Sequence, residues 1–124
     1  MVTTENQELA DYRIPFLLNI DSEIKGLSIE PMLGPVNIKK WIKKIQWVIV
    51  GGESGPKSRA MNPDWIRCIR DTCLENGVAF FFKQWGNWVP DYKEILEIKT
   101  KSGNKEDLVM HRSSKKEAGS VIDG

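Results

Sequence analysis

Four charged side chains stand at positions where acid and base groups would meet. Glu30, Glu53 and Lys83 each follow an apolar run that is predicted to form a strand, and Glu5 takes the equivalent place before the first predicted helix. In α/β proteins, ligands bind beyond the carboxyl ends of the parallel strands. A rim of this kind can hold a hard cation, a cationic ligand or an acid/base pair. Glu30, Glu53 and Lys83 are therefore the candidate catalytic residues. A structural alternative is that Glu53 caps the following turn and Lys83 pairs with Glu30 or Glu53.

A glycine-rich segment over residues 51–59 is a second candidate site. Its glycines would let backbone amides approach an anion, and its serine hydroxyls and arginine would add hydrogen-bond donors and charge. The helix start that follows would add a favourable dipole. The alternative is an ordinary strand-to-helix turn with a solvated basic edge. A tryptophan after the next strand could stack on a base. The predicted ligand- or anion-binding residues are Gly51, Gly52, Ser54, Gly55, Ser58, Arg59 and Trp85.

The residue types give little support for a metal site or for a site with a catalytic nucleophile. Cys68 and Cys73 are five apart in one predicted helix, so their side chains point in different directions and a disulfide is not expected. Iron–sulfur clusters and structural zinc need three or four ligands with tight spacing, so no metal site is predicted. The single histidine, His111, lies in a polar segment, and a Ser-His-Asp or Cys-His arrangement cannot be assembled.

The clearest structural pattern lies in the middle of the chain. Residues 47–50 and 78–82 are continuous apolar runs, typical of strands buried on both faces. Between them, Asn62 is a suitable helix N-cap, Pro63 suits the first helical position, and Gly77 can end the helix. The pattern predicts a βαβ unit with parallel strands and a right-handed crossover.

The first third of the chain is consistent with an earlier copy of this pattern. We expect a helix over residues 6–19 that is interrupted near Pro15, a short strand followed by a turn over residues 26–31 and a short amphipathic helix over residues 36–45. No strand is predicted before the first helix. The fold class is therefore α/β, with about three parallel strands and flanking helices.

The predicted domain covers residues 1–98 and is followed by a polar tail over residues 99–124, loosely packed or extended. Residues 92–98 carry a tyrosine and three aliphatic side chains that would add one edge element before the tail. Three strands with flanking helices make an incomplete sheet. We therefore expect the domain to be part of a larger barrel or sheet, or to complete itself by oligomerising.

Charge and hydropathy limit the partners. Lysine and arginine number 18 against 17 aspartates and glutamates, a net charge of +1, which argues against nucleic-acid binding and a polybasic membrane patch. No apolar run approaches the ~20 residues of a membrane span, and the first residues lack the form of a signal peptide. A cytoplasmic protein without membrane contact is expected.

Successive blocks of the sequence resemble one family of uncharacterised phage and prophage proteins that carry a three-cysteine motif. The family is itself remotely similar to radical S-adenosylmethionine (radical-SAM) enzymes. The similarity runs from about residue 4 to residue 85, with a fainter echo near the end of the chain. The matching blocks are SIEPMLGP at 28–35, WVIVGGESG at 47–55, NPDW at 62–65, FFFKQWG at 80–86 and KEAGSVIDG at 116–124.

The resemblance implies that this chain is the C-terminal part of a (β/α) barrel, as a truncated gene product or an excised domain. The family's three cysteines, the presumed iron–sulfur ligands, would lie in a missing N-terminal half. This chain would hold no cofactor itself, whereas a full-length relative would use S-adenosylmethionine and an iron–sulfur cluster. Glu30, Glu53 and Lys83 match family blocks and would line the barrel mouth.

Three functions follow as expectations from these patterns. The first is an inactive fragment of a radical-SAM-like phage protein that keeps part of a ligand rim and pairs with its missing half. The second is a non-catalytic module that binds a small anion or nucleotide through residues 51–59. The third is a structural remnant that associates with a second copy of itself through exposed strands.

Overall fold

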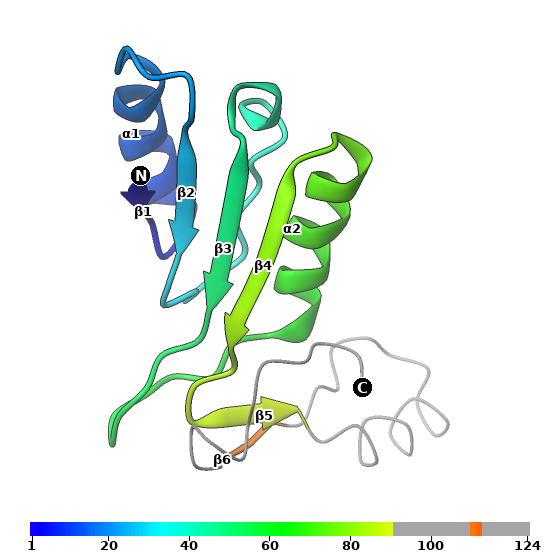
Figure 1. Ribbon diagram of the computed structural model, residues 1–124. Coiled ribbons are helices and arrows are strands. Elements are labelled where there is room, and N and C mark those ends of the chain that lie inside the picture. Colours follow the sequence, from blue (N-terminus) through cyan, green and yellow to red (C-terminus); the bar gives the residue numbers. More distant parts are fainter. Residues whose placement is uncertain (91–109, 113–124) are drawn as a thin grey trace.

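The computed structural model describes residues 1–90 and 110–112 of the chain. Within this part, a four-stranded sheet has the order β1-β2-β3-β4, and every neighbouring pair of its strands is parallel (Figure 1). The predicted α/β class is therefore confirmed. The sheet strands are β1 (Val2–Thr3), β2 (Gly26–Ile29), β3 (Trp47–Gly51) and β4 (Ala79–Gln84), and the α-helices are α1 (Gln7–Leu18) and α2 (Pro63–Glu75).

Strand β1 corrects the expectation that the chain opens on a helix. Val2 and Thr3 pair with Leu27 and Ser28 of β2, and the backbone N–H of Thr4 extends the ladder to the carbonyl of Ser28 at 2.8 Å. The expected number of about three parallel strands was therefore too low for the described residues. Two residues are too few to produce an apolar run, so only their pairing with β2 reveals the strand.

The predicted βαβ unit is present as β3, α2 and β4. The side chain of Asn62 accepts a hydrogen bond from the backbone N–H of Asp64 at 2.8 Å, which caps the first turn of α2. Pro63 occupies the first helical position. Gly77 has a φ of +66°, the left-handed conformation that follows many helix ends.

Helix α1 is not interrupted at Pro15, contrary to the expectation. The helix runs continuously over Gln7–Leu18 with Pro15 inside it. Ile14 and Leu17, on either side of the proline, are both buried. The packing of these side chains holds the helix together across the hydrogen bond that proline cannot donate.

The predicted amphipathic helix over residues 36–45 is also wrong. In its place the chain between β2 and β3 is mostly irregular, with one short 3₁₀ helix, η1 (Ile42–Lys44). Val36 and Ile38 are both buried although they are two residues apart. That spacing belongs to extended chain, so the apolar residues of this segment reach the core without forming a full helix.

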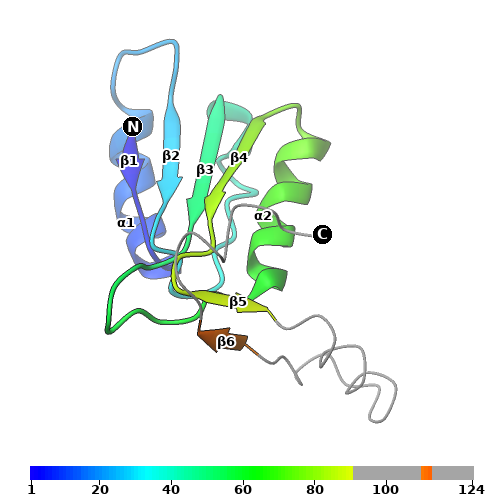
Figure 2. The same ribbon diagram turned by 60° about the horizontal axis from the view of Figure 1, so that its bottom comes forward.

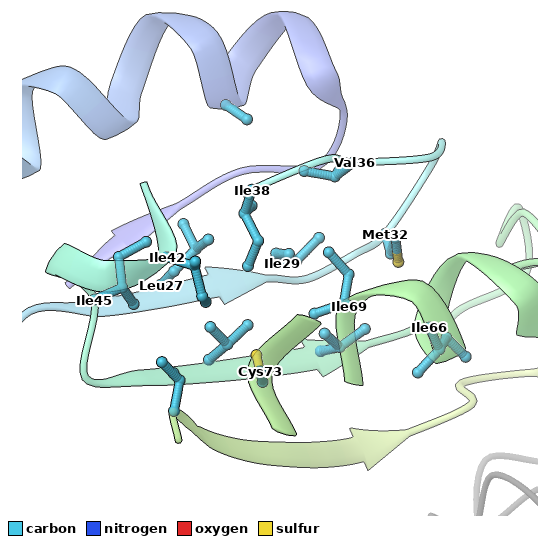
Figure 3. Packing of buried hydrophobic residues seen from close by; sticks show 14 of the residues in the cluster. Leu27, Ile29, Met32, Val36, Ile38, Ile42, Ile45, Ile66, Ile69 and Cys73 are labelled. Atoms are coloured by element: carbon cyan, nitrogen blue, oxygen red, sulfur yellow. The ribbon is translucent and has the colours of Figure 1, made fainter. Parts of the chain in front are cut away.

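The core lies on one face of the sheet. Leu27 and Ile29 of β2 pair in register with Val48 and Val50 of β3, so these four side chains share a face. They form one cluster with buried residues of both helices and of the segment between β2 and β3 (Figure 3). Both α-helices therefore cover the same face. Their buried contributions to the cluster are Ala10, Ile14, Ile66, Ile69 and Cys73.

Beyond the carboxyl ends of the sheet strands, β5 (Trp88–Pro90) and β6 (Met110–Arg112) form an antiparallel pair (Figures 1 and 2). Strand β6 is the described part of the predicted polar tail. The edge element expected over residues 92–98 and the rest of the tail lie outside the described residues. None of the described helices is long and apolar enough to cross a membrane.

Candidate functional site

The candidate site is the rim formed where β2, β3 and β4 end. Lys83 Nζ lies 3.2 Å from Glu30 Oε1, so the two residues form an ion pair across the end of β3. The Lys83 side chain is 51% exposed and the Glu30 side chain 23% exposed, so the pair is open to solvent. The structure therefore brings together two of the three predicted catalytic candidates. The same ion pair was also predicted by the structural alternative, in which Lys83 pairs with Glu30 or Glu53.

Gly51 makes room for this ion pair. A Cβ atom at Gly51 would lie 3.1 Å from Cδ of Glu30 and 3.3 Å from its Oε1. The glutamate side chain therefore lies directly over the backbone of the neighbouring strand. Gly51 was predicted to let backbone amides approach an anion; in the structure, the missing side chain leaves the space that Glu30 occupies.

Glu53 and Arg59 form a second ion pair, which closes the loop after β3. Arg59 donates to the Glu53 carboxylate from Nε at 2.9 Å, from Nη2 at 2.9 Å and from its backbone N–H at 2.8 Å. The side-chain hydrogen bonds from Arg59 are the main reason why the pKa of Glu53 falls from 4.5 to about 2. Glu53 therefore closes the loop, as the capping alternative proposed, and stays ionised at neutral pH.

Glu5 belongs to the same rim. Its Oε2 lies 3.8 Å from Nη1 of Arg13, and its backbone carbonyl accepts a hydrogen bond from the N–H of Leu33 at 2.8 Å. The pKa of Arg59 is raised chiefly by its hydrogen bond to Glu53, with a smaller contribution from the charge of Glu5. Three glutamates and three cations thus line one end of the sheet in the described residues.

Two glycines lock the loop against the chain that follows β4. A Cβ atom at Gly52 would lie 1.9 Å from the carbonyl oxygen of Trp85, and one at Gly86 would lie 2.2 Å from the carbonyl oxygen of Glu53. Hydrogen bonds join the same segments, from Gly52 N to the carbonyl of Gln84 at 2.9 Å and from Asn87 N to the carbonyl of Glu53 at 3.3 Å. The two glycines therefore allow the two backbones to come into contact. This contact fixes the position of Glu53 on the rim.

The predicted anion loop is only partly available to a ligand. Arg59 is engaged by Glu53, and the N–H of Gly55 donates to Oδ1 of Asn87 at 2.7 Å. A pocket of about 380 Å³ is lined by Glu53 and the five residues that follow it. Of the predicted donors, Ser54 is exposed and Ser58 is buried.

Trp85 lies in the core in this structure. Its side chain is 2% exposed, and its ring packs edge-on against Phe82 with 5.0 Å between the centroids. In this position the indole cannot stack on a base.

A larger pocket of about 610 Å³ lies on the helix side, between residues 35–39 and α2. Its walls include Trp65, Cys68 and Glu75. The rim, rather than this pocket, is the candidate site for two reasons. It stands at the carboxyl ends of parallel strands, where α/β proteins bind ligands, and it brings acid and base groups together.

The whole chain, residues 1–124, matches the model of a family described as "Protein of unknown function (DUF5131)". The chain belongs to this family. No curated protein and no solved structure matches it. The family description assigns no activity, so the function of this DUF5131 chain has to be argued from the rim itself.

Sequence reasoning missed two residues of the DUF5131 rim, Arg13 and Gly86. Nothing in the sequence marks Arg13, because its position beside Glu5 depends on how α1 packs beside β1. Gly86 stands directly after Trp85, and its positive φ of +84° could have been suspected from the Gly86-Asn87 turn signal.

A metal cluster does not fit the part of this DUF5131 chain that the structure describes. Within residues 1–90 and 110–112, no three His, Cys, Asp or Glu side chains gather closely enough to hold a metal ion. Cys68 is exposed on α2, whereas Cys73 is buried in the core. As the spacing predicts, the two thiols are free and point in different directions.

Proposed function

We propose that the rim of this sheet is one part of the mouth of a radical-SAM-like (β/α) barrel and binds a small zwitterionic ligand. The observation that carries the proposal is the Lys83–Glu30 ion pair, 3.2 Å long and open to solvent at the carboxyl end of the sheet. The family resemblance in the sequence suggests S-adenosylmethionine as the ligand. On this proposal the chain retains ligand contacts and is inactive on its own.

The ion pair suits a ligand that carries both an ammonium and a carboxylate group. The ammonium group of the ligand would replace Lys83 as the partner of Glu30. The carboxylate of the ligand would then form an ion pair with Lys83. An exposed ion pair contributes about 1 kcal/mol or less, so exchanging it for ligand contacts costs little. Glu53 is already held by Arg59 and acts as a positioning residue that fixes the loop.

S-adenosylmethionine fits this charge pattern because it carries an amino group, a carboxylate and a sulfonium cation. An electron from an iron–sulfur cluster on another part of the protein would break a carbon–sulfur bond of its sulfonium group, giving methionine and a 5′-deoxyadenosyl radical able to abstract hydrogen. The described residues offer no ligand set for such a cluster. We therefore derive binding and orientation for this chain and no chemical step.

Isothermal titration with S-adenosylmethionine tests the proposal. We expect the wild-type chain to bind and both Lys83→Met and Glu30→Gln to weaken binding about tenfold or more, the usual cost of losing a charged hydrogen bond. Asp11→Asn, on the exposed surface of α1, is the matched control and should bind like the wild type. Circular dichroism checks that each variant folds. No binding by the wild type, or equal affinities in all variants, would contradict the proposal.

A second proposal is that the loop after β3 binds a small anion such as a nucleotide phosphate. The pocket of about 380 Å³ supports it, because Ser54, Lys57 and Ser58 are among its lining residues. Titration with ATP should then show binding that Lys57→Ala weakens. Arg59→Ala should weaken it as well, because the loop would lose its tie to Glu53. ATP binding that neither variant affects would remove this proposal.

A further inference from the structure

The described sheet has a face that neither of its α-helices covers. Because the strands run in consecutive order and are connected by crossovers that contribute to one core cluster, α1 and α2 lie on the same side (Figures 1 and 2). Registered pairs define two rows across the opposite face. One row contains Gly26, Trp47 and Ala79, and the other contains Thr3, Ser28, Ile49 and Phe81.

This helix-free face is largely apolar. Phe81 on β4, at one edge of the described sheet, is 59% exposed, and Ala79 on the same strand is exposed as well. The ring of Trp47 lies over Gly26, where a Cβ atom would be only 1.9 Å from the indole. Charged residues stand at the end of the face formed by the carboxyl ends of the strands, where Glu30 pairs with Lys83. The face therefore has an apolar part toward the amino ends of the strands and a polar rim at their carboxyl ends.

Such a face resembles part of the inner wall of a barrel more than a solvent-exposed surface. Parallel sheets are normally covered on both faces. In a closed (β/α) barrel the helices cover the outside, and layers of side chains from the strands fill the inside. The two apolar rows correspond to such layers, and the Glu30–Lys83 rim then stands at the barrel mouth.

We propose that a second copy of this chain covers the helix-free face and completes a barrel. This inference rests on the barrel in the proposed function. The four described strands are half of the eight that a (β/α) barrel contains. A two-fold axis along the barrel would place β1 of each copy beside β4 of the other, closing both sheet edges at once.

A second copy is the occupant that the topology favours. The partner strands must run parallel to these strands, have crossovers of the same handedness and carry helices on the outside. An identical chain meets all three conditions. The two rows contain two hydroxyl residues, Thr3 and Ser28, and no charged residue, so two such faces can approach without burying unpaired charge. The closed dimer would carry two Lys83–Glu30 pairs around one opening.

Sedimentation equilibrium of the full chain tests this inference. We expect a concentration-dependent mass that reaches about twice the chain mass of 14.2 kDa. Phe81→Lys should keep the chain monomeric, because the charge would enter the apolar face. Leu74→Lys is the matched control: Leu74 is 69% exposed but lies on α2, on the outside, and the variant should dimerise normally.

A second variant and a second measurement guard against misfolding. Ala79→Glu, at an exposed position of the same face, should also prevent dimerisation, and circular dichroism reports whether each variant folds. In hydrogen exchange, the amides of β4 should become more protected as wild-type dimer forms. A wild-type chain that stays monomeric, or a dimer that survives both Phe81→Lys and Ala79→Glu, would overturn the inference. A wild-type chain that binds S-adenosylmethionine but stays monomeric at every concentration would overturn the inference while leaving the proposed function standing.

Discussion

At the scale of single residues, the contact between Glu53 and Arg59 controls the charge of the rim. Three hydrogen bonds from Arg59 stabilise the ionised carboxylate and lower the pKa of Glu53 to about 2. Because the folded-state pKa is lowered, the stabilisation is complete above the ordinary value of 4.5 and is lost as the pH falls toward 2. The loop after β3 should therefore stay closed at mildly acidic pH.

An NMR titration of the glutamate carboxyl carbons checks this prediction. Glu53 should titrate near pH 2 in the wild-type chain and at a clearly higher pH in Arg59→Gln, where the side-chain hydrogen bonds and the charge of Arg59 are lost and the backbone N–H of residue 59 remains as a donor. Lys57→Gln, an exposed lysine in the same loop, is the control and should leave the titration of Glu53 low. An ordinary pKa for Glu53 in the wild type would show that the ion pair does not form in solution.

The two cysteines should differ sharply in reactivity. Cys73 is buried against the sheet, and the loss of hydration raises the pKa of its thiol to about 11. Cys68 is exposed on α2, in the wall of the pocket between this helix and residues 35–39. A thiol reagent at neutral pH should modify one site in the native chain and two after denaturation, and Cys68→Ser should abolish the native reaction. Rapid modification of Cys73 in the folded chain would contradict the packing of α2.

At the scale of elements, the two backbones that meet at Gly52 hold the rim in place. In Gly52→Ala the new methyl group would lie 1.9 Å from the carbonyl oxygen of Trp85, and neither backbone can move without breaking the ladder between β3 and β4. We expect a loss of about 3 kcal/mol or more in the free energy of unfolding. Gly34→Ala is the control, since its nearest neighbour would be 3.8 Å away, and should change stability by less than about 1 kcal/mol. Urea denaturation of both variants measures the difference.

The elements that were predicted correctly carry their signals locally. Asn62, Pro63 and Gly77 specify both ends of α2 through caps that involve only near neighbours. By contrast, β1 exists because β2 lies beside it, and the continuity of α1 through Pro15 depends on packing against the sheet. Tertiary contacts determine whether these elements form, and a sequence pattern within a short window carries no information about such contacts.

The rim shows the same division. The rule that the ends of parallel strands share an edge predicts that Glu30 and Lys83 lie on one rim, and in the structure their charged atoms are 3.2 Å apart. The rule does not say which cation each glutamate takes. The pairing of Glu5 with Arg13 and the approach of Gly86 to Glu53 depend on how α1 and the chain after β4 pack.

At the scale of the whole molecule, the sheet separates a well-packed side from an open side. Neighbouring residues of β4 report on the two sides, because side chains alternate along a strand. Phe82 is 8% exposed and packs against Trp85 in the core, whereas Phe81 is 59% exposed on the helix-free face. The same substitution at these two positions therefore compares the two faces with the chemistry held constant.

Phe82→Ala should lower the free energy of unfolding by about 3–5 kcal/mol, because it leaves a cavity in a core that cannot fully collapse. Phe81→Ala should cost less than about 1 kcal/mol when measured at protein concentrations too low for association, since the ring is already hydrated. At higher concentrations, where a second copy would cover the open face, the cost of Phe81→Ala should rise while that of Phe82→Ala stays nearly constant. Urea denaturation across a range of concentrations makes this comparison. Equal losses for the two variants in dilute solution would mean that the open face is already covered within a single chain.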